Sequence, residues 1–190
     1  MKITAGVDEV GRGSLMGPVY AAAVILNSSI DIKLLKDSKS IAKDKRELLS
    51  NYIKKNSTWA VGKASVKEID KINILQASLL AMKRAIKKLK IKPSHILIDG
   101  NKVPDLKNYN LKAVIKGDQK IPSISAASII AKVSRDKFIS TLAKKNNGYG
   151  LDQNFGYGTK QHLTAIKKLG INKHHRKTFS PISRLKTHNI

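Results

Sequence analysis

Apolar and polar residues alternate in strand-like and helix-like stretches along the chain, which predicts an α/β fold. In the first stretch Ile3, Ala5 and Val7 alternate with polar or small residues and lead into an acidic pair. Residues 19–26 are apolar on both faces, which predicts a strand in the interior of the sheet. Further strands are predicted at residues 59–66, 96–98 and 111–115.

The helical stretches repeat their apolar residues at steps of three and four, most clearly over residues 72–90. Other helices are predicted at residues 43–55, 123–145 and 159–169, with Ser40 as the N-cap of the first and Gly170 just past the last. Four residues of the first of these helices are expected to face inward: Leu48, Leu49, Tyr52 and Ile53. We expect residues 1–145 to form an α/β core and residues 146–190 a C-terminal helical and basic region of the same domain.

Charge and the absence of cysteine narrow the classes of function. The 190 residues hold 37 Lys and Arg but only 13 Asp and Glu, so the formal net charge is +24. Such a charge favours a nucleic-acid partner, although a lysine-rich proteome gives the same excess on solvated surfaces. The chain has no Cys, which excludes disulfides, thiolate zinc sites and a cysteine nucleophile. No signal peptide and no run of about 20 apolar residues is present, so we expect a cytoplasmic protein without a membrane segment.

The few carboxylates stand where predicted strands end. Asp8 and Glu9 close the first strand, Asp99 closes the fourth, and Asp118 lies just beyond the fifth. Strand ends that meet at one edge of a sheet gather such residues into a cleft, and hard divalent cations relieve their mutual repulsion. For any one of them, pairing with a Lys or Arg is the simpler interpretation, but the repeated placement favours a Mg²⁺ or Mn²⁺ site. In a cationic protein, this indicates phosphodiester hydrolysis.

A glycine-rich turn, Gly11-Arg12-Gly13, follows the acidic pair directly, and glycine lets the main chain approach a ligand closely. By itself it is an ordinary tight turn. Two other classes fit the composition: a nucleic-acid-binding protein without catalysis, in which the carboxylates pair structurally, and a nuclease acting on DNA such as a junction resolvase.

Several segments, in order, resemble the ribonuclease HII family. They run from Gly6 to Pro181 and cover the acidic pair with its glycine turn, Asp37-Ser38-Lys39, Leu97–Gly100, the segment 125–133 with Arg135-Asp136, Gly156–Thr159 with His162, and His175-Arg176. The related HIII enzymes carry an extra N-terminal domain, for which a first strand starting at Ile3 leaves no room.

The resemblance implies a ribonuclease H-like fold, with a five-stranded mixed sheet flanked by helices and a C-terminal helical region. It implies a two-metal endonuclease, using Mn²⁺ or Mg²⁺, that cleaves the RNA strand of RNA–DNA hybrids. It also implies incision on the 5′ side of single ribonucleotides in duplex DNA, leaving 3′-hydroxyl and 5′-phosphate ends.

The resemblance further implies a role for individual residues. The metal-binding and catalytic acids are Asp8, Glu9, Asp99 and Asp118. The substrate-binding residues are Gly11, Arg12 and Gly13 at the ribose 2′-hydroxyl, Tyr157 at the following deoxyribose, and Lys39 at a phosphate.

Other polar residues are expected to act as support. We predict structural support by His162, and phosphate or solvent contact for His174 and His175. For Asp136, which follows Arg135, we expect a local ion pair or support of the metal ligands, and not direct metal binding. Trp59 is predicted in the core. We expect a monomer, and no protein partner is evident, because residues 186–190 show no glutamine-and-aromatic motif for a sliding clamp.

Overall fold

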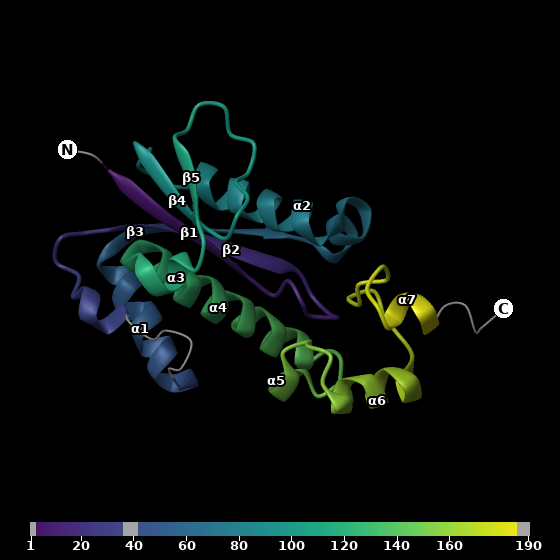
Figure 1. The fold of residues 1–190 in the computed structure, drawn as a ribbon. Helices are drawn as coiled ribbons and strands as arrows, with labels where there is room; N and C mark the ends of the chain where they lie inside the picture. Colours follow the sequence, from purple (N-terminus) through teal and green to yellow (C-terminus); the bar gives the residue numbers. More distant parts are fainter. Residues whose placement is uncertain (1–2, 36–41, 186–190) are drawn as a thin grey trace.

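Five strands form one mixed sheet in the computed structural model, which describes residues 3–35 and 42–185. The strand order is β3-β2-β1-β4-β5 (Figure 1). β1 pairs antiparallel with β2 and parallel with β4, while β3 and β5 form the edges. The predicted five-stranded mixed sheet is therefore confirmed. Its strands are β1 Thr4–Val10, β2 Val19–Leu26, β3 Ser57–Ala64, β4 His95–Asp99 and β5 Leu111–Val114.

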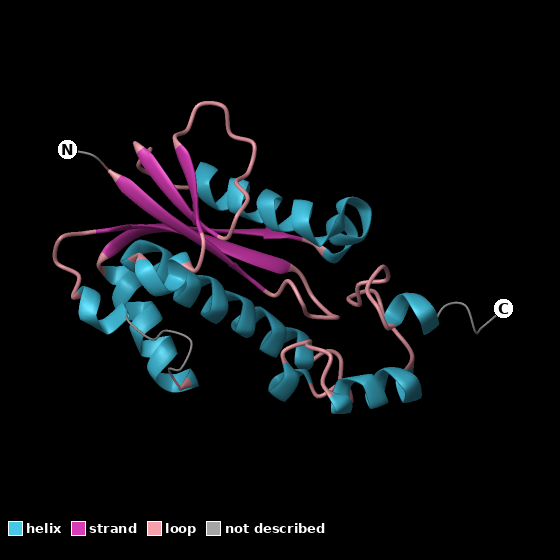
Figure 2. Cartoon of the chain, in the orientation of Figure 1, coloured by secondary structure: helices cyan, strands magenta, loops and turns pink. Residues whose placement is uncertain are grey.

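Helices cover both faces of this sheet. α2 (Val66–Lys87) lies on one face, and α1 (Lys43–Lys55) and α4 (Pro122–Ala143) lie on the other (Figure 2). The flanking helices predicted from the sequence are thus present. The shorter elements are η1 Ile32–Leu35, α3 Gly117–Lys120, α5 Leu151–Asn154, α6 Lys160–Leu169 and α7 Ile182–Leu185.

Among the residues described, the buried apolar side chains form three clusters. One lies between the sheet and α2, and a second lies between the sheet, α1 and α4. In the third, Leu15, Met16 and Ile139 pack against Leu151 and Ile166 of the C-terminal segment. Residues on both sides of position 145 share this third cluster, and the division at that position stays a prediction.

A close approach between β1 and α4 sets the relative position of Asp8 and Ser128. A Cβ on Gly6 would lie 2.1 Å from the main-chain carbonyl carbon of Ser123 and 2.3 Å from the nitrogen of Ile124. Only glycine permits this approach, because such distances lie far inside van der Waals contact. Asp8 lies two residues along the same face of β1, and Ser128 lies about one turn further along α4, so these two side chains meet.

Element boundaries differ from the prediction in a few places. α1 begins as predicted, but its N-cap is Ala42, and Ser40 lies outside the described residues. Leu48 is 71% exposed, so its predicted inward orientation is wrong. Trp59 is not in the core either: it is 38% exposed on the edge strand β3, and the Nζ of Lys54 lies 4.9 Å from its ring centroid.

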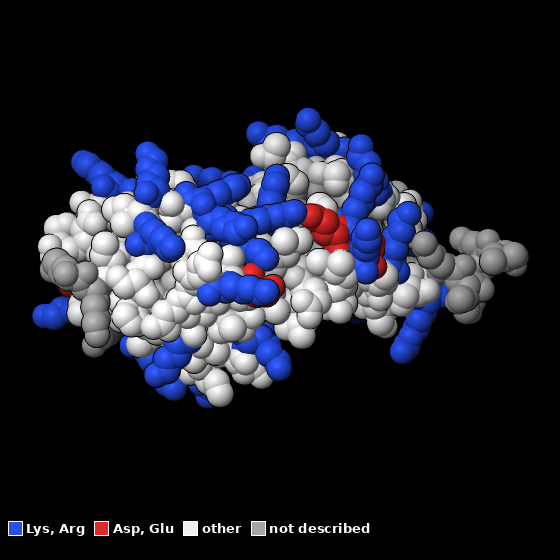
Figure 3. Space-filling view, turned by 90° about the horizontal axis from the view of Figure 1, so that it is seen from above, with Lys and Arg blue, Asp and Glu red and all other residues white. Residues whose placement is uncertain are grey.

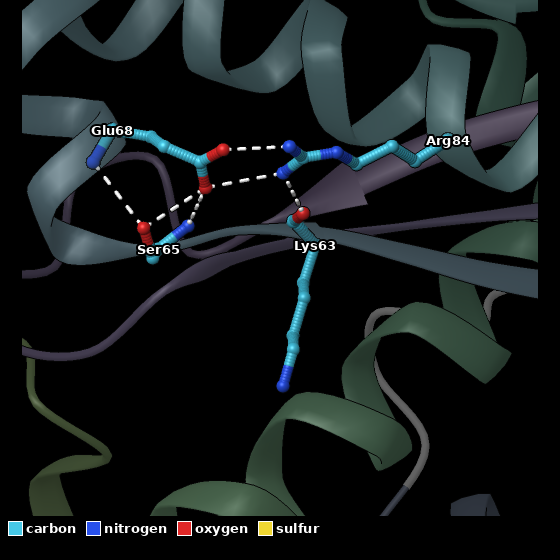
Figure 4. Close-up of polar contacts among 4 residues, drawn as sticks. All are labelled: Lys63, Ser65, Glu68 and Arg84. Carbon is cyan, nitrogen blue, oxygen red and sulfur yellow. Dashed lines mark hydrogen bonds and ion pairs between the residues drawn. The ribbon is translucent and has the colours of Figure 1, made fainter.

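The start of α2 lies six residues before the predicted one, because a capping box begins the helix. The Ser65 hydroxyl accepts from the N–H of Glu68, while the Glu68 carboxylate accepts from the N–H of Ser65. Arg84 donates to both oxygens of Glu68, at 2.6 and 3.1 Å, and to the carbonyl of Lys63 (Figure 4). Asn73 has a non-helical φ of 64° and interrupts α2. The helical repeat of apolar residues is therefore regular only after this point, and the predicted helix begins there.

Replacing Glu68 by Gln is expected to lower the free energy of unfolding by about 1 kcal/mol at neutral pH, because the cap and the Arg84 pair both weaken. The side-chain hydrogen bond from Arg84 is the main cause that lowers the pKa of Glu68 to about 2. Because its pKa is lowered, ionised Glu68 stabilises the fold at pH values above the ordinary pKa of 4.5. This contribution to the free energy of unfolding is lost as the pH falls toward 2. The difference between wild type and E68Q in urea titrations should therefore shrink below pH 4.5.

Glu47→Gln is the matched control, since Glu47 forms a longer, exposed pair with Lys137 at 3.8 Å. It is expected to change stability by less than about 0.5 kcal/mol. Equal effects of the two substitutions at every pH would contradict the role assigned to the α2 cap.

Within the residues described, no helix is both long enough and apolar enough to cross a lipid bilayer.

Candidate active site

Three of the predicted carboxylates line one pocket of about 260 Å³. Asp8 and Glu9 lie at the end of β1, and Asp99 ends the parallel neighbour β4. Because Val7 is in register with Ile98, the two strands deliver Asp8 and Asp99 to the same edge of the sheet. The pocket is completed by Val10, Arg46, Ser128, Ile129 and Lys132.

Burial and mutual repulsion dominate the electrostatics of this pocket. Asp8 is 6% exposed, and its pKa is raised well above the usual value, first by desolvation and then by the charges of Glu9 and Asp99. Desolvation also raises the pKa of Glu9, although Arg12 pairs with it at 3.2 Å. The N–H of Glu9 and the hydroxyl of Ser128 hydrogen-bond to Asp8 but do not neutralise it.

The pocket suits a hard divalent cation. Its donors are carboxylate oxygens, and the buried Oε2 of Glu9 has no hydrogen-bond partner among the described residues. Within the described ranges, no three acidic or imidazole side chains form a ready-made metal cage. This arrangement fits Mg²⁺, which in proteins is often held by one or two carboxylates together with water and substrate phosphate.

Asp118 is placed differently from the other three acids. It is 7% exposed, belongs to the single turn α3, and lines a separate hollow of about 80 Å³ beside η1 and the start of α4. Its neighbour Gly117 connects α3 to the pocket, because the N–H of Gly117 donates to Asp99 at 2.7 Å. Its role as a metal ligand stays a prediction.

The glycine loop, defined here as residues Gly11–Gly13, lies next to the segment that carries Tyr157. Ser14 and Tyr157 form an isolated antiparallel bridge, and the N–H of Leu15 donates to the carbonyl of Gly156. Gly11 has φ 89°, a backbone conformation that favours glycine. The structure thus brings two predicted substrate-binding segments side by side, although 143 positions separate them (157 − 14).

Two basic side chains, Lys132 of α4 and Arg46 of α1, line the acidic pocket. The Nζ of Lys132 lies 5.8 Å from the centroid of the Tyr157 ring. Sequence reasoning assigned no role to Ser128, Lys132 or Arg46. The spacing of four between Ser128 and Lys132 places both on one face of α4, a signal that the sequence contained; nothing in the sequence distinguishes Arg46. Lys39 and the Asp37-Ser38 segment lie outside the described residues.

Asp136 forms a local ion pair, as expected, and its partner is Lys132 at 3.0 Å, because residues i and i+4 share a face of a helix whereas adjacent residues do not. One expectation about the supporting residues needs correction. His175 is fully buried, so it does not meet solvent or phosphate, whereas His174 is half-buried. His162 is also fully buried and its Nδ1 donates to the carbonyl of Tyr157 at 2.9 Å, which agrees with structural support.

Positive charge is spread over more than the pocket. The view from above, over α2, shows Lys and Arg across much of the surface, with a few small acidic patches between them (Figure 3). The net charge by itself therefore does not outline a binding face.

Comparison with known proteins gives a consistent result. The sequence model of the ribonuclease HII family matches residues 5–182 of this chain. A ribonuclease HII from Pelagibacter ubique is 79% identical over 185 residues, which cover 97% of this chain and the whole of that protein.

Solved structures agree on the fold. The crystal structure of ribonuclease H2 from Pyrococcus horikoshii superposes with a TM-score of 0.80 at 29% identity and covers 97% of both chains. The structure of Bst-RNase HIII in complex with Mn²⁺ superposes with a TM-score of 0.75 at 19% identity, over 98% of this chain and 70% of that one. The second likeness concerns the fold alone.

Proposed function

The chain belongs to the ribonuclease HII family of hydrolytic enzymes that act on RNA–DNA hybrids, and from this premise we propose that it also incises duplex DNA at single embedded ribonucleotides. The incision lies on the 5′ side of the ribonucleotide and leaves 3′-hydroxyl and 5′-phosphate ends. We also propose that the enzyme acts in the cytoplasm. Disulfides are rare in that reducing compartment, and this chain has no Cys to form them.

The observation that carries the proposal is the position of the glycine loop between the acidic pocket and Tyr157. The loop directly follows Asp8 and Glu9, and the Ser14–Tyr157 bridge holds its far end. Recognising RNA requires contact with the 2′-hydroxyl, which donates and accepts hydrogen bonds. Main-chain groups of the loop provide such contacts, and the half-buried Tyr157 ring offers a flat surface for the next sugar.

We propose that Asp8, Glu9 and Asp99 hold divalent cations, with Asp118 as a fourth ligand. Such ions activate water and stabilise the departing oxygen in phosphodiester hydrolysis. The donor chemistry of the pocket and the buried, unpartnered Oε2 of Glu9 support this. Lys132 and Arg46 in the pocket walls attract the substrate phosphate, and Ser128 fixes the orientation of Asp8.

A gel assay with three duplexes tests the proposed function: a long RNA–DNA hybrid, a DNA duplex with one ribonucleotide, and an all-DNA duplex. With Mn²⁺ we expect cleavage of the first two and not of the third, and a chelator should abolish both activities. Cleavage of the all-DNA duplex would indicate a DNA nuclease of the same fold. Binding without cleavage of any duplex would indicate a non-catalytic nucleic-acid-binding protein.

The affinity for hybrid should depend steeply on salt, because lysine and arginine contacts release counterions from the phosphates. With about five such contacts, binding by a catalytically inactive variant should weaken roughly 500-fold between 50 and 200 mM salt. Fluorescence anisotropy over this range measures the slope. A nearly flat dependence would show that the charge of +24 is a general surface property and not a binding face.

A further inference from the structure

Two arginines in the family-like segments take no part in the chemistry above. Arg135 of α4 and Arg176 of the C-terminal segment are both fully buried. Within residues 3–35 and 42–185, neither guanidinium forms an ion pair with a carboxylate. A buried charge is costly unless hydrogen bonds satisfy it, so the contacts of these two side chains define what they do.

The guanidinium of Arg176 donates to three carbonyl groups of the turn after β1. Its Nη2 donates to Gly11 at 2.6 Å, its Nη1 to Arg12 at 2.7 Å and its Nε to Gly17 at 3.0 Å. The planar guanidinium thus fixes three carbonyls at once, which a lysine ammonium at the end of a flexible chain does not do.

Arg135 joins the same turn to the segment before Tyr157. Its Nη2 donates to the hydroxyl of Ser14 at 2.7 Å and to the carbonyl of Met16 at 3.1 Å. Its Nε donates to the carbonyl of Pro18 at 3.2 Å. Its Nη1 donates to the carbonyl of Phe155 at 3.0 Å. The two guanidinium groups contact adjacent carbonyls of the turn, Arg135 that of Met16 and Arg176 that of Gly17. Burial, and then the nearby charge of Arg135, lower the pKa of Arg176 to about 9.

These contacts determine which way the glycine loop faces. In a planar trans peptide the carbonyl of one residue and the N–H of the next point in opposite directions. Since the carbonyls of Gly11 and Arg12 point to Arg176, the N–H groups of Arg12 and Gly13 point away from it. No hydrogen bond within the described chain takes up these two N–H groups, so they are available to a ligand.

We propose that Arg135 and Arg176 are positioning residues that hold the glycine loop and the Tyr157 segment in a fixed relative position. This position sets the preference for a ribonucleotide that is followed by a deoxyribonucleotide. This inference rests on the proposed function. Arg176 orients the N–H donors toward the ribose, and Arg135 fixes the distance from these donors to the Tyr157 segment. A DNA duplex with a single ribonucleotide, the junction substrate, needs the contacts of both the glycine loop and Tyr157. A continuous RNA–DNA hybrid depends less on the contact with Tyr157.

Ser14→Ala is the mildest test, with Ser78→Ala as its matched control. Ser14 is fully buried, and its hydroxyl accepts from Arg135 and hydrogen-bonds to the carbonyl of Gly11. Ser78 is 2% exposed on α2, and its hydroxyl has no partner among the described residues. We expect S14A to lower kcat on the single-ribonucleotide duplex about tenfold, and kcat on the long hybrid less than about threefold. KM should stay within about twofold on both substrates, because the basic surface supplies the affinity.

Arg176→Lys should have the larger effect, about 100-fold on the junction kcat, because it keeps the charge but loses the three-carbonyl contact. S78A should behave as wild type on both substrates. An unchanged ratio of junction to hybrid cleavage in S14A would overturn the proposal. The S14A result decides the question even if R176K does not fold.

Amide hydrogen exchange separates this inference from the proposed function. The N–H of Leu15 is bonded to Gly156 and that of Arg176 is bonded to Leu15, so both report on the joined segments. Exchange at both amides should accelerate in S14A and not in S78A. If the wild type does not cut the junction duplex, the proposed function fails while the exchange still tests the relative position of the two segments. Unchanged exchange in S14A would overturn the inference, whatever the wild type cleaves.

Discussion

Asp8→Asn and Asp99→Asn are each expected to lower the cleavage rate of an RNA–DNA hybrid by a factor on the order of 10³, while hybrid binding stays within about threefold. Both residues line the acidic pocket, and Asp8 is 6% exposed. Each substitution keeps the shape of the side chain but removes a negative charge that a divalent cation requires. Affinity should not fall, because the loss of a negative charge near a polyanion favours binding.

Single-turnover cleavage and fluorescence anisotropy on the same hybrid measure these two effects separately. Asp105→Asn makes the same change of charge at an exposed position away from the pocket, and it should leave both quantities unaltered. Turnover close to that of wild type in D8N or D99N at saturating Mg²⁺ would contradict the assignment of these carboxylates to the metal site.

Tyr157→Ala is expected to reduce incision at a single embedded ribonucleotide about tenfold more than cleavage of a long hybrid. At a junction the sugar that follows the ribonucleotide lacks a 2′-hydroxyl, so an aromatic ring can pack closely against it. Within a hybrid that sugar carries the hydroxyl and the contact is already compromised. Comparing kcat/KM for both substrates in the presence of Mn²⁺ gives the ratio.

Tyr109→Ala controls for the loss of a half-buried ring. Tyr109 also carries a lysine over its ring, at 5.3 Å, but it lies beside α2 and does not line the acidic pocket. It should not alter the ratio of the two activities. Equal fractional losses on both substrates in Y157A would mean that Tyr157 only braces the loop, in line with the hydrogen bond from His162 to its carbonyl.

The sheet and most of the acidic pocket could be predicted from the sequence, because both follow from local patterns. The alternation of apolar residues identified β1, and a short apolar run identified β4. Parallel pairing of these two strands brings Asp8 and Asp99 to one edge. α2 was predicted to start too late because Asn73 interrupts the apolar repeat within the helix. The surroundings of Asp118 were not predictable, since α3 is a single turn that starts after Lys116 in the left-handed conformation.

The connections between distant segments could not be predicted for a different reason. Arg135 and Arg176 bind main-chain carbonyls, and a carbonyl is present at every position of the sequence, so it leaves no pattern. Their burial was equally hidden, because arginine is usually exposed and the chain is rich in basic residues. In the same way, the basic composition suggested a phosphate or solvent contact for His175, whereas the fold buries it.

The position of the cut in a DNA duplex with one ribonucleotide distinguishes recognition of the ribose from unspecific cleavage. The strand is labelled at either end, treated with the enzyme and Mn²⁺, and resolved to single nucleotides beside chemically defined markers. We expect one cut, with the ribonucleotide at the 5′-phosphorylated end of the downstream fragment and a 3′-hydroxyl on the upstream fragment. A ribonucleotide retained on the upstream fragment, or an equal cut in the all-DNA duplex, would contradict this expectation.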